Sequence, residues 1–187
     1  MDIFVVHGYQ ASPGEHWFPW LTSRFPSPQD SVTVLELPTP NEPTTAGWIA
    51  ALQESIGRPS AGTVIVAHSL GCIAALRFLA SLDPGWSLGG LILVAGFAEP
   101  LDSLPLLDSF TTGNEFVDRL EISHCTVIGS DNDPVVTPAL TASLADRLGG
   151  RLVIVPGGGH FGSDDGYLTF PEVEAELVGL ATTAVRD

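Results

Sequence analysis

Short apolar runs rich in β-branched residues alternate along the chain with segments in which apolar residues recur every three or four positions. The short runs are typical of buried strands, and the longer spacing is typical of amphipathic helices. The predicted strands cover residues 3–6, 32–37, 63–67, 90–95, 125–129 and 151–155. The predicted helices cover residues 16–25, 45–56, 70–82, 138–148 and 171–183. This alternation predicts an α/β fold, a three-layer sandwich of about six parallel strands with helices on both faces.

Two stretches fall outside this alternation. Pro26 and Pro28 are predicted to end the first helix, because proline cannot continue one. Residues 96–113 show no clean period and are too few for a large cap domain, so we expect a loop or short helix over the sheet edge. Residues 115–120 suit one or two helical turns. Because no repeat, low-complexity tract or linker divides the chain, we expect residues 1–187 to form a single α/β domain.

The charge balance narrows the classes of partner. The chain carries 7 Lys and Arg against 22 Asp and Glu, a formal net charge of −15. Such a charge repels phosphate backbones and anionic lipid surfaces, which argues against nucleic acid and membrane partners. The sequence has neither an apolar stretch of membrane-spanning length nor a leader pattern, so we expect a cytoplasmic protein.

Cysteine and acidic patterns bear on redox and metal chemistry. Cys72 and Cys125 lie in different predicted elements, and we expect both to be free buried thiols. The run Asp131-Asn132-Asp133 resembles the start of a calcium loop, but the glycine and distal glutamate of such a loop are missing. We therefore predict neither a metal nor a cofactor.

The third apolar run leads directly into a turn with a distinctive pattern. Residues 63–66 are all β-branched, Ala67-His68-Ser69-Leu70-Gly71 follows, and an alanine-rich helical pattern begins at once. A strand, sharp turn and helix of this kind lift a serine hydroxyl above the sheet, beside a helix N-terminus. Ala67 stands where the pattern usually has glycine. A serine at this place is often only a helix N-cap, so the turn alone leaves both interpretations open.

Three further loops carry reactive groups at the carboxyl ends of predicted strands, where parallel sheets place their sites. They contain His7-Gly8-Tyr9-Gln10, Asp133 and His160. Serine, then acid, then histidine is the chain order of one class of serine hydrolase. A serine hydroxyl becomes a good nucleophile when a neutral imidazole accepts its proton and a carboxylate holds the other ring nitrogen. We therefore predict Ser69 as nucleophile, His160 as base and Asp133 as acid.

The remaining groups of this predicted site are donors and supports. A tetrahedral oxyanion needs preorganised hydrogen-bond donors. The candidates are the backbone N–H of Leu70, after the predicted nucleophile, and that of Tyr9 or Gln10, after the first strand. We expect His7 to be a buried hydrogen-bonding residue that braces the first loop, and His68 to orient the turn or line the pocket floor.

Several residues compete with these assignments or stand beside them. Asp131 lies two residues before Asp133 and suits an Asx turn, and Glu99, after the fourth strand, is a more remote alternative acid. His16 is expected to be structural or at the surface. Asp164-Asp165 is most simply a solvated turn.

Four motifs, at residues 7–12 with 16–21, 68–72, 130–136 and 159–161, carry a family resemblance. Together they resemble the α/β-hydrolase superfamily, and within it the YdeN and retinoblastoma-binding-protein-9 family of small serine hydrolases. The resemblance spans the whole chain. It implies that Ser69, Asp133 and His160 are nucleophile, acid and base, on a trimmed fold without leading strands or a large cap.

Two functions from different classes fit the predicted fold and site residues. The first is a serine esterase that cleaves ester or related acyl bonds through an acyl-enzyme. The absence of a large cap suggests an open pocket and small acyl substrates. The second is a protein-binding scaffold of the same fold with weak or no hydrolase activity, as the retinoblastoma-binding name in the family hints.

Overall fold

Six parallel strands form one sheet in the order β2-β1-β3-β4-β5-β6. The structure is a computed structural model that describes residues 1–26 and 30–184. The predicted α/β class and parallel sheet are confirmed. Pro28, one of the two prolines predicted to end the first helix, lies outside the described residues. The strands are β1 (Asp2–Val6), β2 (Ser31–Val34), β3 (Thr63–His68), β4 (Gly90–Val94), β5 (Cys125–Ser130) and β6 (Arg151–Val155).

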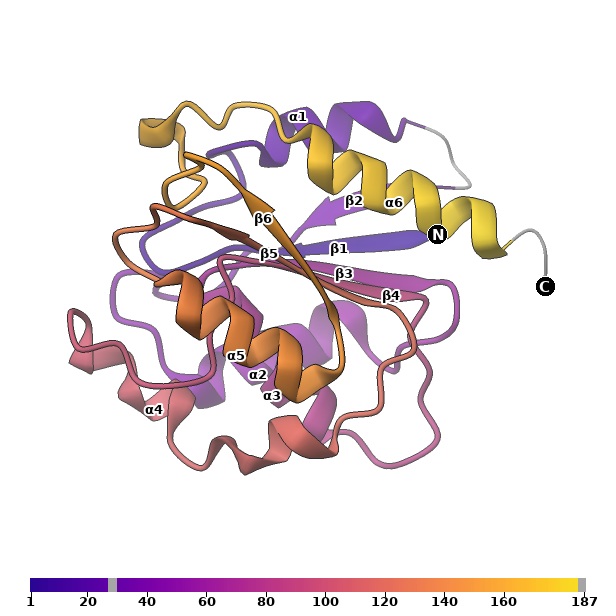
Figure 1. Cartoon of the computed structure of the whole chain (residues 1–187). Coiled ribbons are helices and arrows are strands. Elements are labelled where there is room, and N and C mark those ends of the chain that lie inside the picture. The colour runs from indigo at the N-terminus through magenta and orange to yellow at the C-terminus, as the bar shows by residue number, and fades with distance from the viewer. Residues whose placement is uncertain (27–29, 185–187) are drawn as a thin grey trace.

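Helices cover both faces of the sheet (Figure 1). One face carries α1 (Phe18–Arg24) and α6 (Pro171–Ala184). The opposite face carries α2 (Thr45–Ile56), α3 (Leu70–Ser81) and α5 (Pro138–Leu148). Within the described ranges, no helix has both the length and the apolar character needed to cross a membrane.

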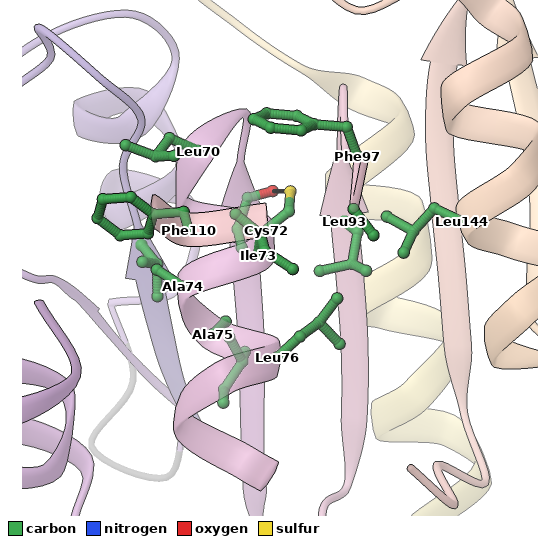
Figure 2. Close-up of a cluster of buried hydrophobic side chains, with 14 of the residues drawn as sticks. Leu70, Cys72, Ile73, Ala74, Ala75, Leu76, Leu93, Phe97, Phe110 and Leu144 are labelled. Atoms are coloured by element: carbon green, nitrogen blue, oxygen red, sulfur yellow. Dashed lines mark hydrogen bonds between the residues drawn. The ribbon is translucent and has the colours of Figure 1, made fainter. Parts of the chain in front are cut away.

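The sheet divides the core into two clusters. Alternate side chains of a strand point to opposite faces, so Val64 and Val66 of β3 pack toward α1 and α6, while Ile65 and Ala67 pack toward α3. Helix α3 is buried along most of its length, between the sheet and residues such as Phe110 (Figure 2). Burial of one large apolar side chain contributes roughly 1.5–3 kcal/mol, so this packing fixes α3 and the turn that precedes it.

The segment after β4 forms short helices, as predicted, but it lies over α3 and α5 rather than over the sheet edge. It contains η1 (Pro105–Leu107), α4 (Asp108–Thr111) and η2 (Asn114–Arg119). Arg77 of α3 donates to the carbonyl oxygens of Phe110 and Thr112. Phe110 is buried with its ring 5.5 Å from that of Trp48. Aromatic burial therefore draws this segment onto the helices.

Two element boundaries differ from the predicted ones by more than one residue. Strand β2 ends at Val34 rather than residue 37, because its neighbour β1 ends at Val6 and the Leu35 N–H makes a last bond to the Val5 carbonyl, at 2.9 Å. Helix α1 begins at Phe18 rather than at residue 16. His16 has a φ of 54°, a left-handed conformation that an α-helix excludes.

Candidate active site

Ser69 occupies a strained turn between β3 and α3. Its φ of 53° and ψ of −122° are rarely adopted by a residue with a side chain. The backbone holds it there, because its N–H donates to the Val94 carbonyl and its carbonyl accepts from the Cys72 N–H, both at 2.9 Å. The Ser69 side chain makes no capping bond to α3, so the interpretation of this serine as only an N-cap is wrong.

Ser69 lies at one end of a hydrogen-bonded path with His160 and Asp133. Its Oγ is 2.9 Å from His160 Nε2, and His160 Nδ1 is 2.8 Å from Asp133 Oδ2. A carboxylate can only accept, so Nδ1 carries the ring proton and Nε2 is free to accept from the serine hydroxyl. The Asp133 side chain is only 1% exposed and that of His160 21%. This arrangement can move a proton from the hydroxyl to the imidazole.

The Asp133 carboxylate is fixed by the turn that it starts. Its Oδ1 accepts from the backbone N–H groups of Val135 and Val136, at 2.8 and 2.9 Å. Two such bonds hold this oxygen of the buried carboxylate in place. Oδ2 is thereby left facing His160.

The two competing acids lie elsewhere. Asp131 accepts from the N–H of Gly157, at 2.8 Å, and thus supports the loop before His160. Glu99 accepts from Ser143 Oγ at 2.9 Å and pairs with Arg147. Of these acids and Asp133, Asp133 is the one whose hydrogen bonds reach the His160 ring.

Side-chain oxygens bind the glycine-rich loop after β6. Besides the bond from Gly157 to Asp131, the Gly159 N–H donates to Asn132 Oδ1 at 2.8 Å, and the His160 N–H donates to Asp165 Oδ2 at 2.9 Å. The predicted turn at Asp165 exists, as η3 (Ser163–Asp165), and it is exposed. The contacts of Asn132 and Asp165 were not predicted from the sequence. The only signal for them was an excess of short polar residues beside three glycines.

Two buried histidines support the site in their neutral form. His68 donates from Nε2 to the His160 carbonyl at 2.8 Å, and burial holds its pKa well below the usual value. His7 donates from Nδ1 to the Gly8 carbonyl at 2.9 Å, and its pKa is also lowered by burial. Each has a second ring nitrogen that is buried and has no hydrogen-bond partner among residues 1–26 and 30–184. His7 is therefore bonded to the loop after β1, and His68 lines the hollow that also contains Ser69.

The backbone around Ser69 presents two N–H groups. In the part of the chain that the structure describes, neither the Leu70 N–H, in the first turn of α3, nor the Tyr9 N–H has a hydrogen-bond partner. The Gln10 N–H already donates to the Pro40 carbonyl, at 3.0 Å. This favours Tyr9 over Gln10 as the second oxyanion donor.

A hollow of about 400 Å³ opens in front of Ser69. The loop after β1 forms one wall, and it passes so close that a Cβ added to Gly8 would lie 3.0 Å from the Ser69 Cβ. His16, further along the same loop, also lines the hollow, and its Nδ1 accepts from the Ser163 N–H at 3.0 Å. Burial lowers the pKa of His16. No group of three or more His, Cys, Asp or Glu within the described residues is arranged to hold a metal ion.

Comparison with known proteins gives one consistent family. A family model described as serine hydrolase matches residues 3–178. YdeN of Bacillus subtilis (strain 168) is 38% identical over 187 residues, which cover 99% of this chain and 98% of that protein. The crystal structure of the ydeN gene product from B. subtilis matches with a TM-score of 0.91 and 36% identity, over 97% of this chain and 98% of that one.

A more distant structure has the same fold. A YdeN-like protein from Pectobacterium atrosepticum matches with a TM-score of 0.69 and 20% identity, over 98% of this chain and 91% of that one. At this identity the likeness concerns the fold alone. The family model and the B. subtilis relative each cover most of the chain, and the chain therefore belongs to the serine hydrolase family, within the α/β-hydrolase fold.

Proposed function

We propose that this chain cleaves ester or related acyl bonds through an acyl-enzyme formed on Ser69. The observation that carries the proposal is the continuous path from Ser69 Oγ through both ring nitrogens of His160 to Asp133, with links of 2.9 and 2.8 Å. The strained turn at Ser69 adds support, because strain of this kind is concentrated at functional sites. Membership of the serine hydrolase family agrees with it.

Acylation uses each group of the path. The Ser69 Oγ attacks the carbonyl carbon of the substrate while His160 Nε2 accepts the hydroxyl proton. The carbonyl oxygen becomes an oxyanion, and the N–H groups of Leu70 and Tyr9 are its proposed donors. Removal of one such donor typically raises the activation free energy by roughly 2.7–4 kcal/mol. Asp133 stabilises the imidazolium through Nδ1–H. When the intermediate collapses, Nε2 returns the proton to the leaving alcohol.

Deacylation repeats the sequence with water. His160 Nε2 accepts a proton from a water molecule as its oxygen attacks the acyl carbon. The second intermediate releases the carboxylic acid and restores the Ser69 hydroxyl with the proton from Nε2. No cofactor enters this proposed cycle, and every proton that leaves a nucleophile returns to a leaving group.

Small acyl substrates suit the hollow. Its volume of about 400 Å³ is at the lower end of the roughly 300–1,000 Å³ typical of small-molecule sites. The short helices after β4 pack on α3 and do not form a large cap. We therefore expect short-chain nitrophenyl esters to be cleaved better than long-chain ones.

The test is covalent labelling by a fluorophosphonate probe, with Ser69→Ala as the matched blank. We expect the native chain to be labelled at Ser69 and the variant to remain unlabelled. Hydrolysis of nitrophenyl acetate should be lost in the same variant. Native protein that folds normally but takes no label at Ser69 would refute the proposal and favour the protein-binding scaffold.

A further inference from the structure

His160 lies in a loop whose backbone has little intrinsic order. Three glycines precede it, and Gly157, Gly159 and Phe161 all have positive φ values, of 70°, 55° and 60°. Glycine leaves a chain many alternative conformations. The position of the proposed base must therefore be set by contacts other than a strand or helix ladder.

Side chains supply these contacts. All four polar groups of His160 bond to a side chain of another residue. The ring nitrogens bond to Ser69 and Asp133, the carbonyl oxygen accepts from His68 Nε2 at 2.8 Å, and the N–H donates to Asp165 Oδ2 at 2.9 Å. Two of these contacts fix the ring and the other two fix the backbone that carries it.

The Asp165 carboxylate lies within the turn that it holds. Its Oδ2 also accepts from the Gly162 N–H, at 3.2 Å. The loop wraps it so closely that a Cβ added to Gly159 would lie 2.2 Å from Asp165 Oδ1. A single exposed carboxylate thus packs against Gly159 and accepts from the N–H groups of His160 and Gly162.

We propose that Asp165 is a positioning residue, which sets the reach of the His160 ring toward Ser69 by holding the His160 backbone N–H. The inference rests on the proposed function, since it assigns Asp165 a role in proton transfer by His160. Asp165 touches neither Ser69 nor the ring nitrogens of His160 in the structure, so its effect passes through the backbone. A displacement of about 1 Å in a reacting group costs up to about a hundredfold in rate.

Two substitutions at residue 165 separate the hydrogen bonds from the charge. Asp165→Ala removes both, and we expect kcat to fall by about 10- to 100-fold with KM changed less than about threefold. Asp165→Asn keeps an oxygen that accepts from the His160 N–H but removes the charge, and we expect kcat within about threefold of the native value. The rate constant of fluorophosphonate labelling at Ser69 should follow kcat in both variants.

Asp164→Ala serves as the matched control. Asp164 is the adjacent exposed acid, and within residues 1–26 and 30–184 its side chain makes no hydrogen bond or ion pair. Asp164 lines the hollow, as Asp165 does, so its removal measures the loss of one negative charge beside the site without loss of a bond to the His160 backbone. We expect the loss in Asp165→Ala to exceed that in Asp164→Ala by at least about tenfold. Thermal unfolding of each variant checks that it is folded.

The outcomes separate this inference from the proposed function. If the native chain takes no label at Ser69, the proposed function fails and this inference fails with it. If the native chain is labelled and Asp165→Ala is labelled equally fast, Asp165 is not a positioning residue while the proposed function stands. Equal losses in the Ala and Asn variants, or in Asp165→Ala and Asp164→Ala, would show an effect of charge and overturn the assignment.

Discussion

Gly71, in the first turn of α3, packs directly against the carbonyl oxygen of Val6 at the end of β1. A Cβ added to Gly71 would lie 2.4 Å from that oxygen and 2.6 Å from the His7 carbonyl oxygen. The helix that follows Ser69 therefore approaches the first strand as closely as a backbone without side chains allows. This contact brings the N-terminus of α3 beside the loop that carries Tyr9.

Gly71→Ala should destabilise the fold. The added methyl meets backbone atoms, which cannot rotate away as a side chain can, and such overpacking typically costs about 1–3 kcal/mol. Denaturation by urea should show a lower midpoint. Gly179→Ala in α6 is the control, because a Cβ there meets nothing within 4 Å. Removing a helical glycine should stabilise the chain by about 0.5–1 kcal/mol, and a loss in both variants would contradict the steric explanation.

Asp133→Asn should nearly abolish turnover while leaving the site intact. The amide oxygen of the substituted side chain should take over the hydrogen bonds from the N–H groups of Val135 and Val136, which leaves the amide nitrogen facing His160 Nδ1. His160 Nδ1 must then accept a hydrogen bond from the amide, so the ring proton moves to Nε2. With a proton on Nε2, the ring can no longer accept the proton of the Ser69 hydroxyl. A wrong tautomer of this kind costs on the order of 10⁴ in kcat, measurable with nitrophenyl acetate.

Asp131→Asn is the control for this substitution. Within the described residues, Asp131 accepts one N–H, from Gly157, and an amide oxygen can accept this bond too. We expect a loss of less than about tenfold. A comparable loss in both variants would mean that the charge of the loop, and not the tautomer of His160, governs the rate.

Much of the fold was predictable because strands and helices leave different periods in the sequence. Residues 64–67 and 90–95 are apolar at every position, as is typical of strands covered on both faces. Since parallel strands end at one edge, Ser69, Asp133 and His160 were expected to meet, and their distances bear this out. Cys72 and Cys125 are buried free thiols, as predicted.

Other features depend on the conformation of loops, which the spacing of apolar residues in the sequence does not predict. Because His16 has a left-handed conformation, α1 begins only at Phe18. Because Phe110 is buried, the segment after β4 packs on α3. Asp165 was interpreted as part of a solvated turn, and it is exposed in one. Its contact with the His160 N–H depends on how three glycines bend, which composition cannot predict.

The buried histidines should make stability depend on pH. His68 is held neutral in the native state because burial lowers its pKa, whereas in the unfolded chain it titrates near its ordinary value of about 6.5. Below that pH the unfolded state binds more protons, so the free energy of unfolding falls as the pH falls. One such group contributes a slope of up to about 1.4 kcal/mol per pH unit.

His68→Gln isolates this contribution. Glutamine can donate to the His160 carbonyl but does not titrate. Urea denaturation at several pH values between about 5 and 7 should give a shallower dependence in the variant than in the native chain. Parallel pH profiles for the two proteins would show that His68 does not resist protonation.

Both thiols should be unreactive in the native protein. Burial raises the pKa of Cys125 to about 12 and that of Cys72 still further above its usual range. The thiolate is the reactive form, so Ellman's reagent should detect no thiol before unfolding and two after it, as the sequence contains two cysteines. A thiol that reacts rapidly in the native state would contradict their burial.

The strain at Ser69 should be measurable without any substrate. Its φ of 53° and ψ of −122° belong to a region that costs a residue with a Cβ about 1–3 kcal/mol. Glycine adopts such angles freely, although its greater freedom in the unfolded chain offsets about 0.5–1 kcal/mol of the gain. Ser69→Gly should therefore be more stable than Ser69→Ala by about 1 kcal/mol.

This comparison is informative because both variants lose the hydroxyl and its bond to His160, and differ only in whether the strained turn carries a Cβ. The bonds that hold the turn, from Ser69 N–H to Val94 and from Cys72 N–H to the residue 69 carbonyl, use backbone atoms that both variants keep. Urea denaturation of the two proteins gives the difference directly. If Ser69→Gly is the less stable of the two, the strain at this turn is smaller than the roughly 0.5–1 kcal/mol that the freedom of glycine in the unfolded chain costs, and the prediction is wrong.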